Sequence, residues 1–125
     1  MKIIIIAILL FPVIANASNW MFVSKSTVGE SYFIDTQSMM FNGNEVSFWA
    51  KVNYKVRNKY GDLSSKEQWT MNCRTKESNL MYMTSYSDFD NRGKINGSYK
   101  VPVDWSPIPP DTTAEEILKF VCKKL

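Results

Sequence analysis

Histidine is absent from this 125-residue sequence, which contains only two cysteines and five glycines. Without histidine, the chain lacks the commonest general base, the usual catalytic triads and a frequent zinc ligand. It also contains no GxSxG element, no glycine-rich phosphate loop and no repeated acidic pattern of the kind that binds calcium. We therefore expect a protein that is not an enzyme and that uses no metal and no cofactor.

A strong charge of either sign is also missing. The formal net charge is +3, and the lysine and arginine residues are scattered along the chain without forming a block. Nucleic-acid-binding proteins usually concentrate basic residues in a patch or along one stripe. The sequence therefore indicates no nucleic-acid partner and predicts an ordinary mixed surface.

The only long apolar run lies at the N-terminus, where Lys2 precedes residues 3–14. The run is shorter than the roughly 20 residues that cross a bilayer as a helix. Small residues follow it in Ala15-Asn16-Ala17, a pattern typical of a secretory signal peptide. We expect cleavage after Ala17, which leaves residues 18–125 as one exported domain without a transmembrane anchor. No cysteine follows the run to carry the lipid of a bacterial lipoprotein.

Export bears on the chemical state of the two cysteines, Cys73 and Cys122. In an oxidising compartment an even pair is typical of a disulfide, and two thiols without histidine do not make an ordinary zinc site. We therefore expect a Cys73–Cys122 disulfide. A free reactive thiol is the alternative that the sequence leaves open.

The middle of the chain predicts β-strands. In residues 44–56, NEVSFWAKVNYKV, apolar side chains occupy the even positions from Val46 to Val56, and most odd positions are polar. This period of two is typical of a strand with one face toward solvent. Less regular strands are expected within residues 19–25, 31–35, 63–73, 78–89 and 97–101. Five or six short strands with short connections predict an antiparallel sheet.

The C-terminal segment predicts a helix. Three prolines within residues 107–110 favour an extended connector. Thr112 and Glu115 then stand at capping-box spacing, and residues 114–125 place one apolar face at helical spacing, with Cys122 on it. The expected fold class is therefore α+β: a five- or six-stranded antiparallel sheet with one C-terminal helix packed on it and tied by the disulfide.

One tryptophan breaks the alternation of residues 44–56. Trp49 falls on the polar face of the expected strand, together with Lys51 and Asn53. Because an exposed tryptophan is a common anchor for a protein partner, these three residues form the candidate protein-binding surface. The alternative is that Trp49 is covered, either by the connector at residues 102–110 or by a second copy of the chain.

Two polar motifs predict turns rather than sites. Asp88 and Asp90 could contact a cation, but no glutamate follows at the spacing of a calcium loop. Asn96-Gly97-Ser98 matches a glycosylation acceptor, and its surroundings are typical of a turn.

Taken in order, these features resemble the surface-adhesin protein E-like family of Gram-negative bacteria. The residues that carry the resemblance are Trp20, YFID (32–35), NGNEVSFWAKVNY (42–54), QWTMNC (68–73), YMTSY (82–86) and WSPIPPDTTAEEILKFVC (105–122). The resemblance covers essentially all of residues 18–125. It implies an antiparallel sheet whose C-terminal helix is tied to it by Cys73 and Cys122.

The resemblance also implies a function. It implies a non-catalytic, adhesin-like exported module that recognises a protein partner, with host extracellular matrix as the expected class, and that can pair as a homodimer. The missing lipid-carrying cysteine favours an alternative, a soluble periplasmic factor such as an envelope-enzyme inhibitor or an envelope-maintenance protein. The expected location is the periplasm, the cell surface or the secreted fraction.

Overall fold

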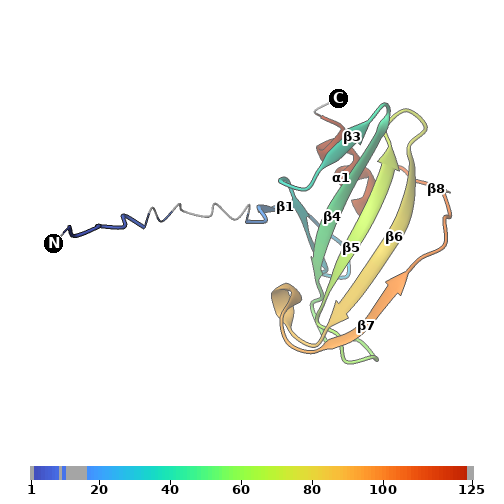
Figure 1. The fold of residues 1–125 in the computed structure, drawn as a ribbon. Coiled ribbons are helices and arrows are strands. Elements are labelled where there is room, and N and C mark those ends of the chain that lie inside the picture. The colour runs from blue at the N-terminus through green and yellow to red at the C-terminus, as the bar shows by residue number, and fades with distance from the viewer. Residues whose placement is uncertain (1, 9, 11–16, 124–125) are drawn as a thin grey trace.

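The computed structural model describes residues 2–8, 10 and 17–123. Before the first strand, the described residues form neither helix nor strand (Figure 1). Residues 11–16, which include most of the expected cleavage motif, lie outside the described residues, so the boundary after Ala17 stays a prediction. No helix in the described part of the chain is long and apolar enough to span a bilayer.

Within the described residues, eight strands form one antiparallel sheet. The strands are β1 (Trp20–Lys25), β2 (Ser31–Asp35), β3 (Met40–Asn42), β4 (Glu45–Asn53), β5 (Ser64–Asn72), β6 (Glu77–Tyr86), β7 (Ile95–Lys100) and β8 (Ser106–Pro107). The main order is β1-β2-β4-β5-β6-β7, while β3 pairs with β4 and β8 pairs with β6. The expected class is confirmed, but the expected strand count was too low, because β3 and β8 are too short to show an alternation in sequence.

Strand β4 follows the predicted alternation closely. Its even-numbered side chains from Val46 to Val52 are at most 1% exposed, whereas its odd-numbered ones are half-buried. A tight turn joins β3 to β4, since β3 ends at Asn42, β4 begins at Glu45 and Gly43 has a φ of +59°. Gly43 reaches this conformation without the steric cost that a side chain would bring. One face of β4 is therefore core, and the other remains available for contacts outside the core.

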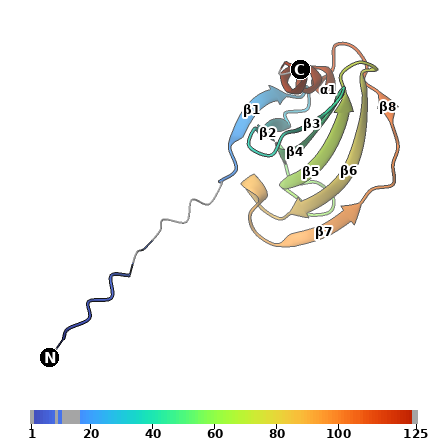
Figure 2. The same cartoon turned by 45° about the horizontal axis from the view of Figure 1, so that its top comes forward.

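The helix α1 (Thr113–Cys122) packs at one end of the core face of the curved sheet (Figure 2). Its start is capped as predicted, because the backbone N–H of Glu115 donates to Thr112 Oγ1 over 3.2 Å. The helix packs its apolar side chains against the sheet and joins it through the predicted Cys73–Cys122 disulfide, whose Cα atoms lie 5.9 Å apart. The buried core of the helix and sheet consists of Ile34, Val46, Phe48, Ala50, Met71, Ile108, Ile117, Leu118 and Val121.

Two segments differ from expectation in their position. Ile108 of the connector is only 9% exposed and belongs to the core beside α1, so this part of the connector lies on the opposite side of the sheet from Trp49. The prediction of a turn at Asn96-Gly97-Ser98 was wrong, because these residues lie inside β7 and pair with β6, whereas the strand expected within residues 97–101 is confirmed. A short strand at the sheet edge with small side chains gave only a weak strand signal in sequence.

Candidate binding surface

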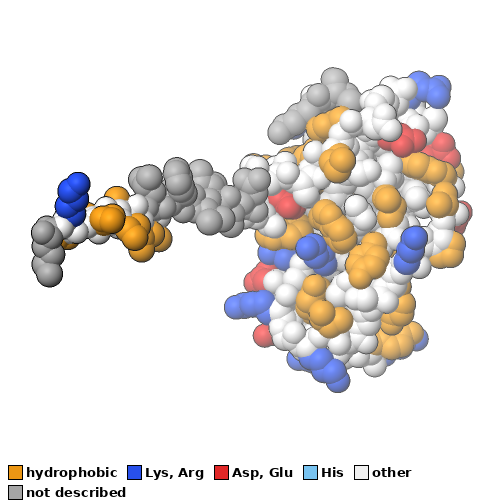
Figure 3. Space-filling model, viewed as in Figure 1, with side chains coloured by type: hydrophobic (Ala, Val, Ile, Leu, Met, Phe, Trp, Pro, Cys, Tyr) orange, Lys and Arg blue, Asp and Glu red, His pale blue; other side chains and the backbone are white. Residues whose placement is uncertain are grey.

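The face of the sheet opposite α1 is here named the open face. The strand register places two neighbouring rows of side chains across it. One row is Phe22, Phe33, Lys51, Lys66 and Thr84; the other is Trp49, Gln68, Tyr82 and Lys100. In Figure 1, α1 lies behind the sheet, and the same view in Figure 3 shows apolar side chains interspersed with basic ones on this face.

Trp49 lies in the middle of the open face, half-buried by its neighbours on adjacent strands. Its ring meets the Tyr82 ring edge-on, with centroids 5.9 Å apart and planes at 76°. The ammonium of Lys66 lies 4.9 Å from the Trp49 ring centroid. Such aromatic and cation–π contacts each contribute about 0.5–1.5 kcal/mol, so the Trp49 ring is held in one orientation. A rigid, partly exposed tryptophan suits a binding anchor because little side-chain entropy remains to be lost.

Lys51 is more deeply placed than Trp49. Its side chain is 12% exposed, and its ammonium lies 4.8 Å from the Phe33 ring centroid and 5.3 Å from that of Trp20. The ammonium also lies 3.3 Å from the carboxylate of Asp90. Lys51 is therefore fixed between two rings and a carboxylate, and serves to hold the face together.

Asn53 pairs with the same aspartate through two hydrogen bonds. Asn53 Nδ2 donates to Asp90 Oδ1 and the Asp90 backbone N–H donates to Asn53 Oδ1, both over 2.8 Å. Together with the nearby Lys51 and Arg92 cations, the Asn53 hydrogen bond lowers the pKa of Asp90. These bonds anchor the short helical turn η1 (Phe89–Asn91) across one end of the open face. The three candidate residues thus share one face, but Lys51 and Asn53 are engaged within the chain, and Trp49 is the available one.

Sequence reasoning missed Tyr82, Lys66 and the two phenylalanines of the open face. The pairing of β5 with β6 shifts between Gln68 and Trp69 of β5, so that Leu80 lies opposite Trp69 while Tyr82 lies opposite Gln68. This bulge puts Leu80 and Tyr82 on opposite faces although they are two residues apart. The sequence did carry one sign of this bulge. In residues 78–89 both faces of the expected strand are partly apolar, which is typical of a strand whose alternation is interrupted.

Glu67 was also missed, and it lies on the core side of β5. Its carboxylate accepts hydrogen bonds from Trp69 Nε1 over 2.8 Å and from Ser65 Oγ over 3.1 Å. Burial raises the pKa of Glu67 above its ordinary value, although these two hydrogen bonds partly oppose the shift. The native state therefore binds the Glu67 proton more tightly than the unfolded state, and the charged form destabilises the fold at neutral pH.

We expect Glu67→Gln to raise the melting temperature at pH 7 by a few degrees, corresponding to about 1 kcal/mol. The amide oxygen can still accept from Trp69, but no charge has to be buried. The gain should disappear as the pH falls below about 4.3, where the unfolded glutamate is itself protonated. Thermal denaturation at a series of pH values measures the change in melting temperature, with Glu77→Gln at the first residue of β6 as the control. A lower melting temperature for Glu67→Gln at pH 7 would contradict this interpretation.

Residues 20–123 match the family model of surface-adhesin protein E. The chain belongs to the surface-adhesin protein E family. This confirms the resemblance found in the sequence, and the family's adhesin character supports an adhesin-like role and export. A comparison with curated protein sequences finds no match.

Solved structures of Haemophilus influenzae protein E have the same fold. One crystal form is 22% identical, with a TM-score of 0.66, and the alignment covers 94% of this chain and 98% of that one. Protein E from non-typeable Haemophilus influenzae is 21% identical, with a TM-score of 0.62 and coverage of 90% and 81%. At such identities the likeness shows a shared fold, and the binding residues have to be argued from this chain itself.

Proposed function

We propose that this family member is a non-catalytic exported adhesin that binds a protein partner through its open face. Family membership supports the adhesin-like role. The observation that carries the choice of surface is the central pair of Trp49 and Tyr82, held edge-to-face on a face that α1 does not cover. Aromatic residues with a polar end are enriched at protein interfaces and supply much of their binding energy.

The charge of the open face supports a partner with acidic groups. Lys66 and Lys100 flank the aromatic pair, and neither has a carboxylate within salt-bridge distance among the described residues. Lysines around an aromatic centre attract an acidic surface and orient it, and the rings then supply contact area. We propose host extracellular-matrix proteins as the partner class, because the family is one of surface adhesins.

A solid-phase binding assay tests this proposal. Residues 18–125 are incubated with a panel of immobilised extracellular-matrix proteins, and bound protein is measured against salt concentration. We expect binding to at least one of them, weakening about tenfold as NaCl rises from about 0.05 M to about 0.5 M, because salt screens exposed lysines. Lys66→Ala should reduce this salt dependence, whereas Lys119→Ala on the exposed side of α1 should not.

Two results would contradict the proposal. One is the absence of binding to every protein of the panel. The other is salt dependence that Lys66→Ala leaves unchanged. Cell fractionation provides a separate test of location: a non-penetrating protease added to intact cells should digest a surface adhesin. Complete protection, with release only by osmotic shock, would favour the soluble periplasmic alternative.

A further inference from the structure

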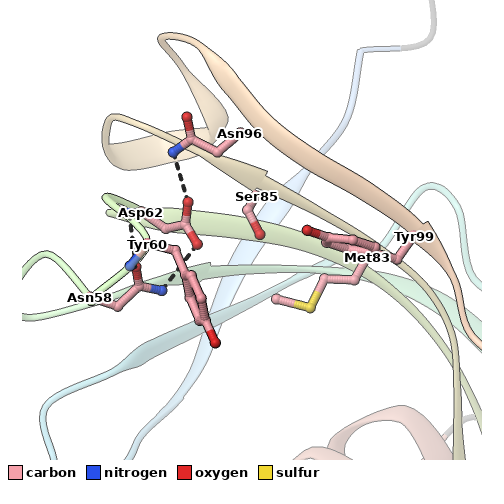
Figure 4. Close-up of a pocket in the computed structure, with 7 residues that line it drawn as sticks. All are labelled: Asn58, Tyr60, Asp62, Met83, Ser85, Asn96 and Tyr99. Atoms are coloured by element: carbon pink, nitrogen blue, oxygen red, sulfur yellow. Dashed lines mark hydrogen bonds between the residues drawn. The ribbon is translucent and has the colours of Figure 1, made fainter.

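A pocket of about 520 Å³ lies away from the open face, between the β4–β5 loop, β6 and β7 (Figure 4). One of its side chains, Met83 of β6, lies opposite Glu67 in the strand register, which places the pocket on the same side of the sheet as the core. None of the residues proposed above for the partner surface lines this pocket. Its volume is within the range of about 300–1,000 Å³ typical of small-molecule sites.

The β4–β5 loop forms one wall of the pocket and is held in shape by hydrogen bonds with Asn58 and with Arg57, whose guanidinium donates to the Gly61 carbonyl over 2.9 Å. Asn58 Oδ1 accepts hydrogen bonds from the backbone N–H groups of Tyr60 and Asp62, over 3.0 and 2.9 Å. Gly61 has a φ of +84°, which a residue with a side chain rarely adopts. This fixed loop presents the Tyr60 side chain outward, 72% exposed.

The polar part of the pocket is built around a buried carboxylate. Asp62 is only 4% exposed, and its two carboxylate oxygens accept from Asn96 Nδ2 over 2.7 Å and from Asn58 Nδ2 over 3.0 Å. Ser85, which is also buried, adds a hydroxyl to the lining. The pocket thus presents carboxylate, amide and hydroxyl groups in fixed positions, with donors and acceptors on neighbouring atoms.

The apolar part consists of two tyrosines and a methionine. Tyr60 and Tyr99 come from different segments and are both exposed, and Figure 4 shows Met83 between them. An exposed aromatic ring offers a flat apolar surface that a ligand can cover.

We infer that this pocket binds a saccharide of one or two sugar units. A sugar ring combines hydroxyl groups, which both donate and accept, with flat C–H faces that pack on aromatic rings. The pocket supplies both kinds of partner, in Ser85 and Asn96 and in Tyr60 and Tyr99. Its lining contains no lysine or arginine, which disfavours an anionic ligand. Its single carboxylate is already shared between two amides, which disfavours a cation as the main ligand.

Saturation-transfer difference NMR tests this inference. The probes are glucose, galactose, mannose, N-acetylglucosamine and lactose, each at millimolar concentration with residues 18–125, because an open site of this kind gives weak binding. We expect transfer to the ring protons of at least one of them. Tyr60→Ala should weaken that binding about tenfold, since it removes one stacking surface and leaves the fold intact.

Two variants complete the test. Asn96→Ala removes a donor that also holds Asp62, so its loss of binding is informative only if its melting temperature stays near that of the wild type. Met40→Ala, an exposed side chain of β3 at the other end of the sheet, should bind the sugar normally. No transfer to any of the sugars would overturn the inference. The same conclusion would follow if Tyr60→Ala bound the sugar as well as the wild type. Spermidine, a polycation measured in parallel, would overturn the inference if it bound while none of the sugars did.

Discussion

Replacing both cysteines by alanine should lower the free energy of unfolding by about 4 kcal/mol. Cys73 and Cys122 are 49 residues apart in sequence, and the bond between them restricts the unfolded chain over the whole of that loop. In the native state it fixes the last turn of α1 beside β5. A loss of this size is a large share of the roughly 5–15 kcal/mol that stabilises a typical domain.

Equilibrium unfolding in guanidinium chloride measures this effect. The double variant Cys73→Ala with Cys122→Ala is compared with the oxidised wild type, and the reduced wild type should unfold close to the double variant. The double variant is preferable to either single one, since a single substitution leaves a thiol that can form intermolecular bonds. A loss below about 1 kcal/mol would show that packing of α1 on the sheet, and not the disulfide, holds the helix in place.

Trp49→Ala should weaken partner binding about 30-fold while lowering the free energy of unfolding by only about 1 kcal/mol. The large effect on binding follows from its central position on the open face, where the ring loses its remaining exposure to solvent on contact. The small effect on folding follows because the core packs on the other side of β4.

Surface plasmon resonance with the matrix protein found in the binding assay gives the change in Kd, and thermal denaturation gives the change in stability. Lys119→Ala on α1 is the control for binding. Trp69→Ala is the control for folding, because that ring packs against the core and its loss should cost about 3 kcal/mol or more. If Trp49→Ala unfolds the domain as Trp69→Ala does, Trp49 belongs to the folding core and the proposed surface is wrong.

The features predicted correctly from sequence were those with a local signal. The alternation of β4, the capping box at Thr112 and the helical spacing that includes Cys122 each depend on neighbours within a few positions along the chain. The expectation of export then favoured a disulfide between the two cysteines. Together these patterns determined the fold class and the pairing.

The features that were missed depend on contacts between distant segments. Asn53 and Asp90 are 37 positions apart, so their mutual hydrogen bonds leave no pattern in either segment. The shift in register opposite Gln68 moves Tyr82 onto the open face, and this bulge can be located only when both strands are paired. The pocket beside Tyr60 combines one loop with two strands, so its composition becomes visible only in the folded chain.

Site-specific photo-crosslinking tests the role of the open face most directly. A benzophenone amino acid placed at Gln68, between Trp49 and Tyr82 in the strand register, is compared with the same group at Lys119 on α1. After irradiation with the bound matrix protein, mass spectrometry identifies the crosslinked chains. The open-face proposal predicts a crosslink to the partner from position 68 and none from position 119. Crosslinking from position 119 alone would place the partner on the helix and contradict it.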